Sequence, residues 1–261
     1  MMKRFLRQIL CLLTAVVMMT AFVTAFAEEK GGYTLENIRD CVVGVNEPIT
    51  LEDGTSRPLI NFDNAATTPA LQPVMDEVNG KLLMYGSIGR GYSQKSDIST
   101  EIYEQTRKTV LSFVGLDPED YTYTCFYVNN TTDGLNKLAS ALITSPDDIV
   151  LTTRIEHHAN DLSWRERCHV IYAEVDGMGR VDYDELERLL EENEVKLVAV
   201  TAASNVTGYI TDVHRVAKMA HAHGALLVVD GAQIVAHRSF SMPGETPDED
   251  VDFFVFSAHK M

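Results

Sequence analysis

The stretch "KLVAVTAASNVTGYITDVHRVAKMAHAHGALLVVD", residues 196–230, decides the fold class. It begins and ends with short runs of apolar and β-branched residues, KLVAVTA at 196–202 and ALLVVD at 225–230. Such runs are typical of buried strands. Between them, residues 213–224 have helical spacing and close on Gly224, a common residue just after a helix end. This order of strand, helix and strand indicates an α/β unit with parallel strands.

The same alternation extends along most of the chain. Four more strand-like runs are YTCFYV (123–128), DIVLTT (148–153), HVIYAEV (169–175) and DFFVFS (252–257). Helical patterns occupy residues 183–193 and 96–115, the second opening with Ser96 as a predicted cap and ending at Gly115. Residues 28–60 are rich in turn formers. The sequence therefore predicts an α/β fold with a largely parallel sheet.

Composition and charge exclude several classes of protein. The chain has 261 residues, of which 45% are hydrophobic and 23% are charged, so it can bury a core as one large or two modest domains. Its net charge is −16, and an acidic surface of this kind repels nucleic acid. We therefore expect a globular protein without a nucleic-acid partner.

Residues 1–27 have the layout of a signal peptide. Lys3, Arg4 and Arg7 precede a long uncharged run, and Ala25-Phe26-Ala27 predicts cleavage before Glu28. Loss of these three basic residues would change the net charge from −16 to −19. The apolar run is also long enough to remain as a membrane anchor, with its positive flank in the cytoplasm. The leader thus predicts an exported or membrane-anchored chain.

Cysteine usage indicates a different compartment. Cys11 lies in the leader, while Cys41, Cys125 and Cys168 are far apart and form no C-x-x-C pair. This spacing predicts no disulfide framework. Three such cysteines are more typical of a cytoplasmic protein than of a secreted scaffold.

Chemistry-bearing residues follow four of the predicted strands. Open α/β sheets bind ligands beyond the carboxyl ends of their strands, so these positions are candidates for a site. They are His157 and His158 after 148–153, Asn205 after 196–202, Asp230 and Gln233 at and after 225–230, and Ser257, His259 and Lys260 at and after 252–257. Together they supply an imidazole, an amide, a carboxylate and an amine.

Taken singly, each of these residues has an ordinary interpretation. Asp230 and Asn205 are common turn formers, and His157 or Lys260 alone could be a simple core or surface residue. A metal site is not favoured, because adjacent histidines and the HAH at 221–223 point to different sides of their elements and no H-E-x-x-H occurs. The GSIGRG stretch at 86–91 fits no nucleotide-binding motif, so its glycines are interpreted as shaping a loop.

The combination of these groups suits a pyridine aldehyde cofactor. A lysine forms its Schiff base, a carboxylate keeps its ring nitrogen protonated, and a planar side chain stacks on the ring. Its phosphate requires backbone N–H groups at a helix start. Thr131 and Thr132, opening the helical stretch in VNNTTDGLNKLASAL (128–142), provide such a start, although a plain Thr or Asp cap is the alternative for that segment.

Seven motifs in order carry a family resemblance. They are NFDNAATTPALQPV (61–74), GRGYSQKSDISTEIYEQTRKTVLSFVG (89–115), NNTTDGLN (129–136), EHHAN (156–160), SNVTG (204–208), VDGAQ (229–233) and DFFVFSAHK (252–260). Together they resemble the class V aminotransferase family of pyridoxal phosphate (PLP) enzymes, in its cysteine desulfurase and selenocysteine lyase branch. The resemblance implies that residues 61–261 form part of the PLP-binding large domain of fold type I, after an N-terminal segment at 28–60.

The resemblance also implies a role for each candidate. Lys260 would be the Schiff-base lysine, Asp230 the partner of the pyridine nitrogen, and His157 the stacking side chain. Contacts to the phenolic oxygen would come from Asn205 and Gln233, and phosphate contacts from Thr131, Thr132, Ser257 and His259. The implied reaction releases sulfur from L-cysteine to give L-alanine, passes the sulfur to an acceptor protein, and is carried out by a homodimer.

The chain departs from the family pattern in two ways. Family members continue past this lysine into a small C-terminal domain, with a sulfur-accepting cysteine and an arginine for the substrate carboxylate. None of Cys41, Cys125 and Cys168 falls at that cysteine's position, so we expect an incomplete chain. Family members usually work in the cytoplasm, in contrast to the predicted leader. Open alternatives are an epimerase, another amino-acid lyase, or a non-catalytic exported protein that keeps the fold.

Overall fold

The computed structural model describes residues 33, 34 and 36–261, so the predicted leader at 1–27 lies outside the described residues. The chain divides into two compact units. One runs from Leu111 to Ser257, and the other comprises the described residues up to Val110 together with Ala258–Met261. The domain limits predicted around residue 60 remain a prediction. Within the described part, no helix combines the length and apolar character needed to cross a bilayer.

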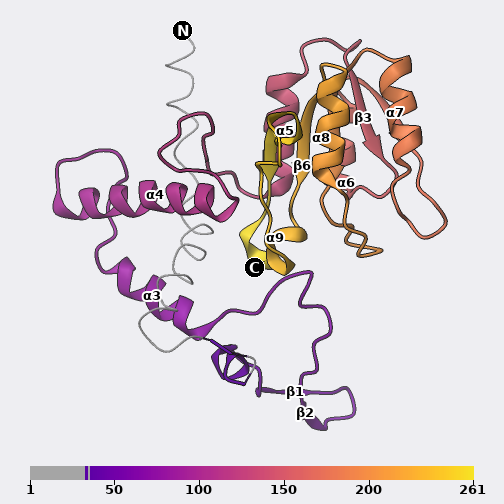
Figure 1. Cartoon of the computed structure of the whole chain (residues 1–261). Helices are drawn as coiled ribbons and strands as arrows, with labels where there is room; N and C mark the ends of the chain where they lie inside the picture. The colour runs from indigo at the N-terminus through magenta and orange to yellow at the C-terminus, as the bar shows by residue number, and fades with distance from the viewer. Residues whose placement is uncertain (1–32, 35) are drawn as a thin grey trace. The chain divides into compact units, whose positions relative to one another are not determined.

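A five-stranded sheet forms the centre of the 111–257 unit (Figure 1). Every neighbouring pair in it is parallel, which confirms the predicted sheet. In spatial order its strands are β4 (His169–Ala173), β3 (Ile149–Thr153), β5 (Val195–Thr201), β6 (Leu226–Asp230) and β7 (Phe253–Val255). The sequences of β5 and β6 are almost continuously apolar. Both faces of a parallel sheet are covered, so most side chains along such a strand are buried.

Helices connect these strands and cover the sheet. They are α5 (Thr131–Leu142), α6 (His158–Arg165), α7 (Tyr183–Glu192), α8 (Val213–Ala222) and the short α9 (Ile234–His237). Helix α5 contacts α6, and α7 contacts α8. Side chains of Asn130, Asp182 and Asp212 cap α5, α7 and α8 by accepting backbone N–H bonds. Gly224 has φ +74° just beyond α8, as its predicted role as a stop requires.

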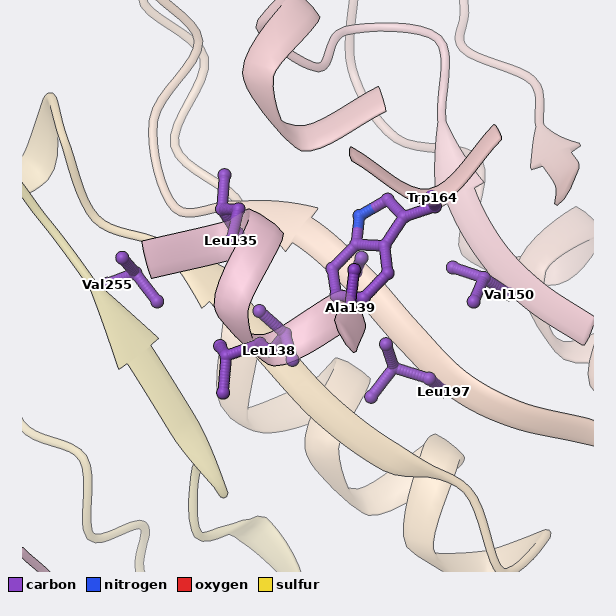
Figure 2. Packing of buried hydrophobic residues seen from close by; sticks show 9 residues of the cluster. Leu135, Leu138, Ala139, Val150, Trp164, Leu197 and Val255 are labelled. Atoms are coloured by element: carbon purple, nitrogen blue, oxygen red, sulfur yellow. The ribbon is translucent and has the colours of Figure 1, made fainter. Parts of the chain in front are cut away.

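The hydrophobic core lies between the sheet and helices α5 and α6 (Figure 2). Trp164 of α6 is fully buried there, beside Ala139 of α5 and the sheet residues Val150 and Leu197. The other buried members of the cluster are Leu135, Leu138, Ala199, Val228 and Val255. Because side chains alternate along a strand, neighbours such as Val198 and Leu227 are buried on the opposite face.

Two predictions from the sequence are wrong in detail. Residues 123–128 form no strand, although their composition suits one, because a strand needs a neighbouring ladder and none pairs with this segment in the described part of the chain. Ser96 does not cap its helix, since α4 (Gln94–Phe113) begins earlier and the Ser93 hydroxyl accepts the Ser96 N–H.

The second unit contains mostly local structure before α4. It includes a 3₁₀ turn (Ile38–Cys41), the antiparallel hairpin of β1 (Pro48–Thr50) and β2 (Ser56–Pro58), and α3 (Gln72–Leu82). The glycine loop at 86–91 is held by three hydroxyl groups at the start of α4. Gly86, Gly89 and Gly91 donate their N–H groups to Ser99, Thr100 and Ser96. This arrangement confirms the interpretation of these glycines as shaping a loop.

Gly231 provides a test of packing at the end of β6. An added Cβ would lie 2.1 Å from the Phe254 ring, which itself stacks on Phe240 with ring centroids 4.2 Å apart. We expect Gly231→Ala to lower the free energy of unfolding by about 1–3 kcal/mol, the usual cost of overpacking. Urea unfolding followed by circular dichroism measures this. Gly177→Ala is the control, because a Cβ there meets no atom within 4 Å, and equal unfolding midpoints for the two variants would refute the packing argument.

Candidate functional site

Four predicted site residues lie along the carboxyl edge of the parallel sheet. The ends of β5, β6 and β7 are aligned there, since Thr201 pairs with Asp230, and Asp230 pairs with Val255. The residues that emerge at this edge, in the spatial order β3, β5, β6 and β7, are His157, Asn205, Asp230 and Ser257. The sheet thus brings the predicted imidazole, amide and carboxylate to one edge, where α/β proteins bind ligands.

Asp230 is the most enclosed of these residues. It is 2% exposed, and its Oδ1 accepts the N–H of Ala232 at 2.9 Å. A carboxylate at this edge of the sheet is an acceptor for a positively charged N–H group of a ligand. Gln233, three residues later, is half-buried and precedes α9.

A second cluster of polar atoms lies at the start of α5. The backbone N–H of Thr131 donates to Ser257 Oγ at 2.8 Å, and the two hydroxyl groups are 2.7 Å apart. Both residues are buried, whereas Thr132 is exposed. The structure therefore brings Thr131, rather than Thr132, against Ser257. A helix start with N–H and hydroxyl donors is a typical anion-binding arrangement.

His157 and Asn205 are exposed residues of the loops that follow β3 and β5. His157 caps α6, with its Nδ1 accepting the N–H of Ala159 at 3.1 Å. Because Nδ1 accepts this bond, the neutral ring carries its proton on Nε2. The cap fixes the orientation of an imidazole ring at the sheet edge. Asn205 lies in a turn in which the backbone N–H groups of Val206 and Thr207 donate to Ser204 Oγ.

Lys260 and His259 belong to the second unit. They lie in a short 3₁₀ turn (Ala258–Lys260), which begins directly after Ser257 in the sequence. Thr68 donates its N–H to the His259 carbonyl at 3.1 Å and its hydroxyl to the Lys260 carbonyl at 2.6 Å. Thr67 Oγ1 is 3.4 Å from His259 Nδ1. The TT pair of the 61–74 motif thus holds the backbone that carries Lys260.

Sequence reasoning missed Glu156 as a candidate within EHHAN. Its carboxyl group accepts the Thr153 hydroxyl at 2.6 Å and the Asn160 amide at 2.7 Å. Burial of the carboxyl group raises the pKa of Glu156 to about 8, and the negative charge of Asp230 acts in the same direction. The available signal was the spacing of Glu156 and Asn160, four residues apart at the start of a helix.

Comparison with known protein families shows the family to which this chain belongs. The family "aminotransferase class-V" matches residues 60–261. This chain belongs to the class V aminotransferase family. Members of this family are PLP-dependent enzymes, and the family resemblance noted in the sequence is confirmed.

Several relatives of this chain are named as cysteine desulfurases or probable cysteine desulfurases. The cysteine desulfurase of Haloferax volcanii is 34% identical over 220 residues, covering 80% of this chain and 50% of that protein. A probable cysteine desulfurase of Mycolicibacterium paratuberculosis is 34% identical over 223 residues, covering 82% of this chain and 31% of that protein. The chain therefore spans about a third to a half of these relatives.

Solved structures show the same fold. The apo cysteine desulfurase from Thermococcus onnurineus superposes with a TM-score of 0.74 at 30% identity, covering 87% of this chain and 54% of that chain. A NifS-like protein from Rickettsia africae superposes with a TM-score of 0.67 at 21% identity, covering 76% of this chain and 53% of that chain, a likeness that shows the fold alone. These likenesses confirm the predicted fold of a PLP-dependent enzyme.

Proposed function

We propose that this chain carries the PLP-binding part of a cysteine desulfurase, which releases sulfur from L-cysteine and leaves L-alanine. The main support is the carboxyl edge of the sheet. Asp230 is buried at the end of β6, and Ser257, which follows the neighbouring strand β7, contacts Thr131 at the start of α5. Relatives named as cysteine desulfurases support the choice of substrate. We propose further that the sulfur passes to an acceptor protein and that the working enzyme is a homodimer.

The polar groups at this edge fit pyridoxal phosphate in kind. Its phosphate would be held by the hydroxyls of Thr131 and Ser257 at the positive end of α5. Its ring nitrogen would be held by the buried carboxylate of Asp230 at the end of β6. The imidazole of His157, oriented by its cap bond, would cover the ring face.

The residues of the chain would then divide the chemistry among them. The cofactor supplies an electron-withdrawing ring that stabilises negative charge on the substrate's α-carbon. Asp230 would keep a proton on the ring nitrogen, because its negative charge favours the protonated form. Lys260 would provide the amine that holds the cofactor and would exchange a proton with the substrate's α-carbon. His259 and Thr132 would add phosphate contacts, and Asn205 and Gln233 contacts to the phenolic oxygen.

The reaction is tested by supplying the full-length protein with PLP and L-cysteine. We expect sulfide, in the presence of a thiol reductant, and alanine in equal amounts, with no product when L-serine replaces cysteine. Measurement of both products by mass spectrometry and a sulfide probe distinguishes the alternatives. Turnover of another amino acid without sulfide would instead support an epimerase or a different lyase. A chain that binds no PLP would support a non-catalytic protein with this fold.

Thr68 provides a test of how the Lys260 turn is held. Thr68→Val removes the hydroxyl that donates to the Lys260 carbonyl while keeping a β-branched side chain. We expect PLP affinity to fall about fivefold, corresponding to one hydrogen bond of about 1 kcal/mol. Spectroscopic titration with PLP measures this. Thr68→Ser keeps the hydroxyl and is expected to retain most of the affinity, so equal losses in the two variants would contradict this role.

A further inference from the structure

Glu156 joins three elements at the carboxyl edge of the sheet. Thr153, the last residue of β3, donates its hydroxyl to one carboxyl oxygen, and Asn160 of α6 donates its amide to the other. The backbone N–H of Thr201, the last residue of β5, also donates to this carboxyl group. The Glu156 side chain thus accepts hydrogen bonds from the ends of two neighbouring strands, β3 and β5, and from helix α6.

These bonds connect the edge of the sheet to the hydrophobic core. Asn160 is fully buried, and its Oδ1 accepts the indole N–H of Trp164 at 3.2 Å. Trp164 is packed in the hydrophobic core between the sheet and helix α5. The path from Glu156 through Asn160 to Trp164 therefore anchors the segment that carries His157 to the hydrophobic core of the unit.

We propose that Glu156 is a positioning residue of the cofactor site, which fixes the His157 loop relative to the strand ends that carry Asn205 and Asp230. This role rests on the proposed function, since it concerns the same site. Glu156 itself would not contact the cofactor. It acts through Thr153, Thr201 and Asn160, which place the residues that do.

The charge of Glu156 is part of this role. The carboxylate of Asp230 on β6 is the charged group that acts on it, while β3, β5 and α6 face it with a hydroxyl, a backbone N–H and an amide. Burial and Asp230 raise its pKa to about 8, so Glu156 is mainly protonated at neutral pH. A protonated Glu156 leaves the negative charge at this edge on Asp230, where a cationic ring nitrogen would need it.

The protonated state has a measurable consequence for stability. The unfolded chain loses the Glu156 proton near the ordinary pKa of 4.5, whereas the folded chain keeps it until about pH 8. Between these values unfolding releases a proton, so the contribution of Glu156 to stability is present at low pH and falls as pH rises through this window. Above pH 8 the contribution becomes constant.

The test combines this pH profile with cofactor binding. Urea unfolding of the 261-residue chain and its Glu156→Gln variant is measured from pH 4.5 to 9. The difference in stability, wild type minus variant, is expected to fall across the window and level off near pH 8. Glu166→Gln, at an exposed position beyond the other end of α6, is the matched control and is expected to show no such change. A constant difference for Glu156→Gln would overturn the protonated state.

Positioning is tested by PLP titration at pH 7. Glu156→Ala is expected to weaken PLP binding about tenfold, because the variant loses a buried side chain that receives several hydrogen bonds. Its visible circular dichroism, which reports the orientation of the bound ring, is expected to decrease, and Glu156→Gln is expected to recover part of both. Wild-type binding and dichroism in Glu156→Ala would overturn the proposal. Absence of binding by the wild-type chain would instead overturn the proposed function, while the stability profile would still report on Glu156.

Discussion

Replacing Asp230 by asparagine is expected to weaken PLP binding by about 10- to 100-fold, because a hydrogen bond to a charged group is worth about 1.5–3 kcal/mol. Asparagine keeps the size of the side chain and an oxygen that can accept the Ala232 N–H. It loses the negative charge that would hold a proton on the ring nitrogen. The spectroscopic titration that measures PLP affinity therefore separates the effect of charge from the effect of shape.

Asp212→Asn is the matched control for this experiment. Asp212 caps α8 by accepting the Arg215 N–H, and asparagine is an equally good cap. We expect this variant to bind PLP like the wild type. Equal affinity of Asp230→Asn and wild type would show that the carboxylate at the end of β6 does not contact the cofactor.

Replacing Trp164 by alanine is expected to lower the free energy of unfolding by about 3–5 kcal/mol. The indole of Trp164 is fully buried in the core between the helices and the sheet, and its N–H donates to Oδ1 of the buried Asn160. Its loss leaves a cavity and an acceptor with fewer partners. Because native proteins are stable by only about 5–15 kcal/mol, this is a large part of the total.

Urea unfolding followed by far-ultraviolet circular dichroism measures this effect. Fluorescence is unsuitable for the variant because Trp164 is the only tryptophan in the sequence. Leu162→Ala, on the same helix but 54% exposed, is the control and is expected to change stability by less than about 0.5 kcal/mol. Similar losses in both variants would contradict the assignment of Trp164 to the core.

The sheet could be predicted because its strands are buried on both faces. Such strands need continuous apolar runs, so those at 196–202 and 225–230 stand out in the sequence. The run at 123–128 has the same composition but lacks a ladder, because strand formation depends on a partner that composition does not specify. Ser96 failed as a cap for a similar reason, since its hydroxyl is used by the glycine loop rather than by its own helix.

The candidate site was only partly predictable. His157, Asn205 and Asp230 could be found because parallel strands end at one edge and chemistry gathers there. Glu156 could not be found in this way, since within EHHAN it resembles a residue of a polar turn, and its bonds with Thr153 and Asn160 form only when α6 follows β3 in the fold. The contacts of Thr68 with the Lys260 turn join positions 192 residues apart, and no local pattern indicates them.

The most direct test of the proposed PLP site is to map which residue of the chain bonds to PLP. The protein is incubated with PLP, reduced with borohydride, digested and examined by peptide mass spectrometry. The proposed function predicts a pyridoxyl mass increase on the peptide that contains Lys260, and none on peptides that contain exposed lysines such as Lys95 and Lys218. An unmodified Lys260, or label spread evenly over the exposed lysines, would contradict it.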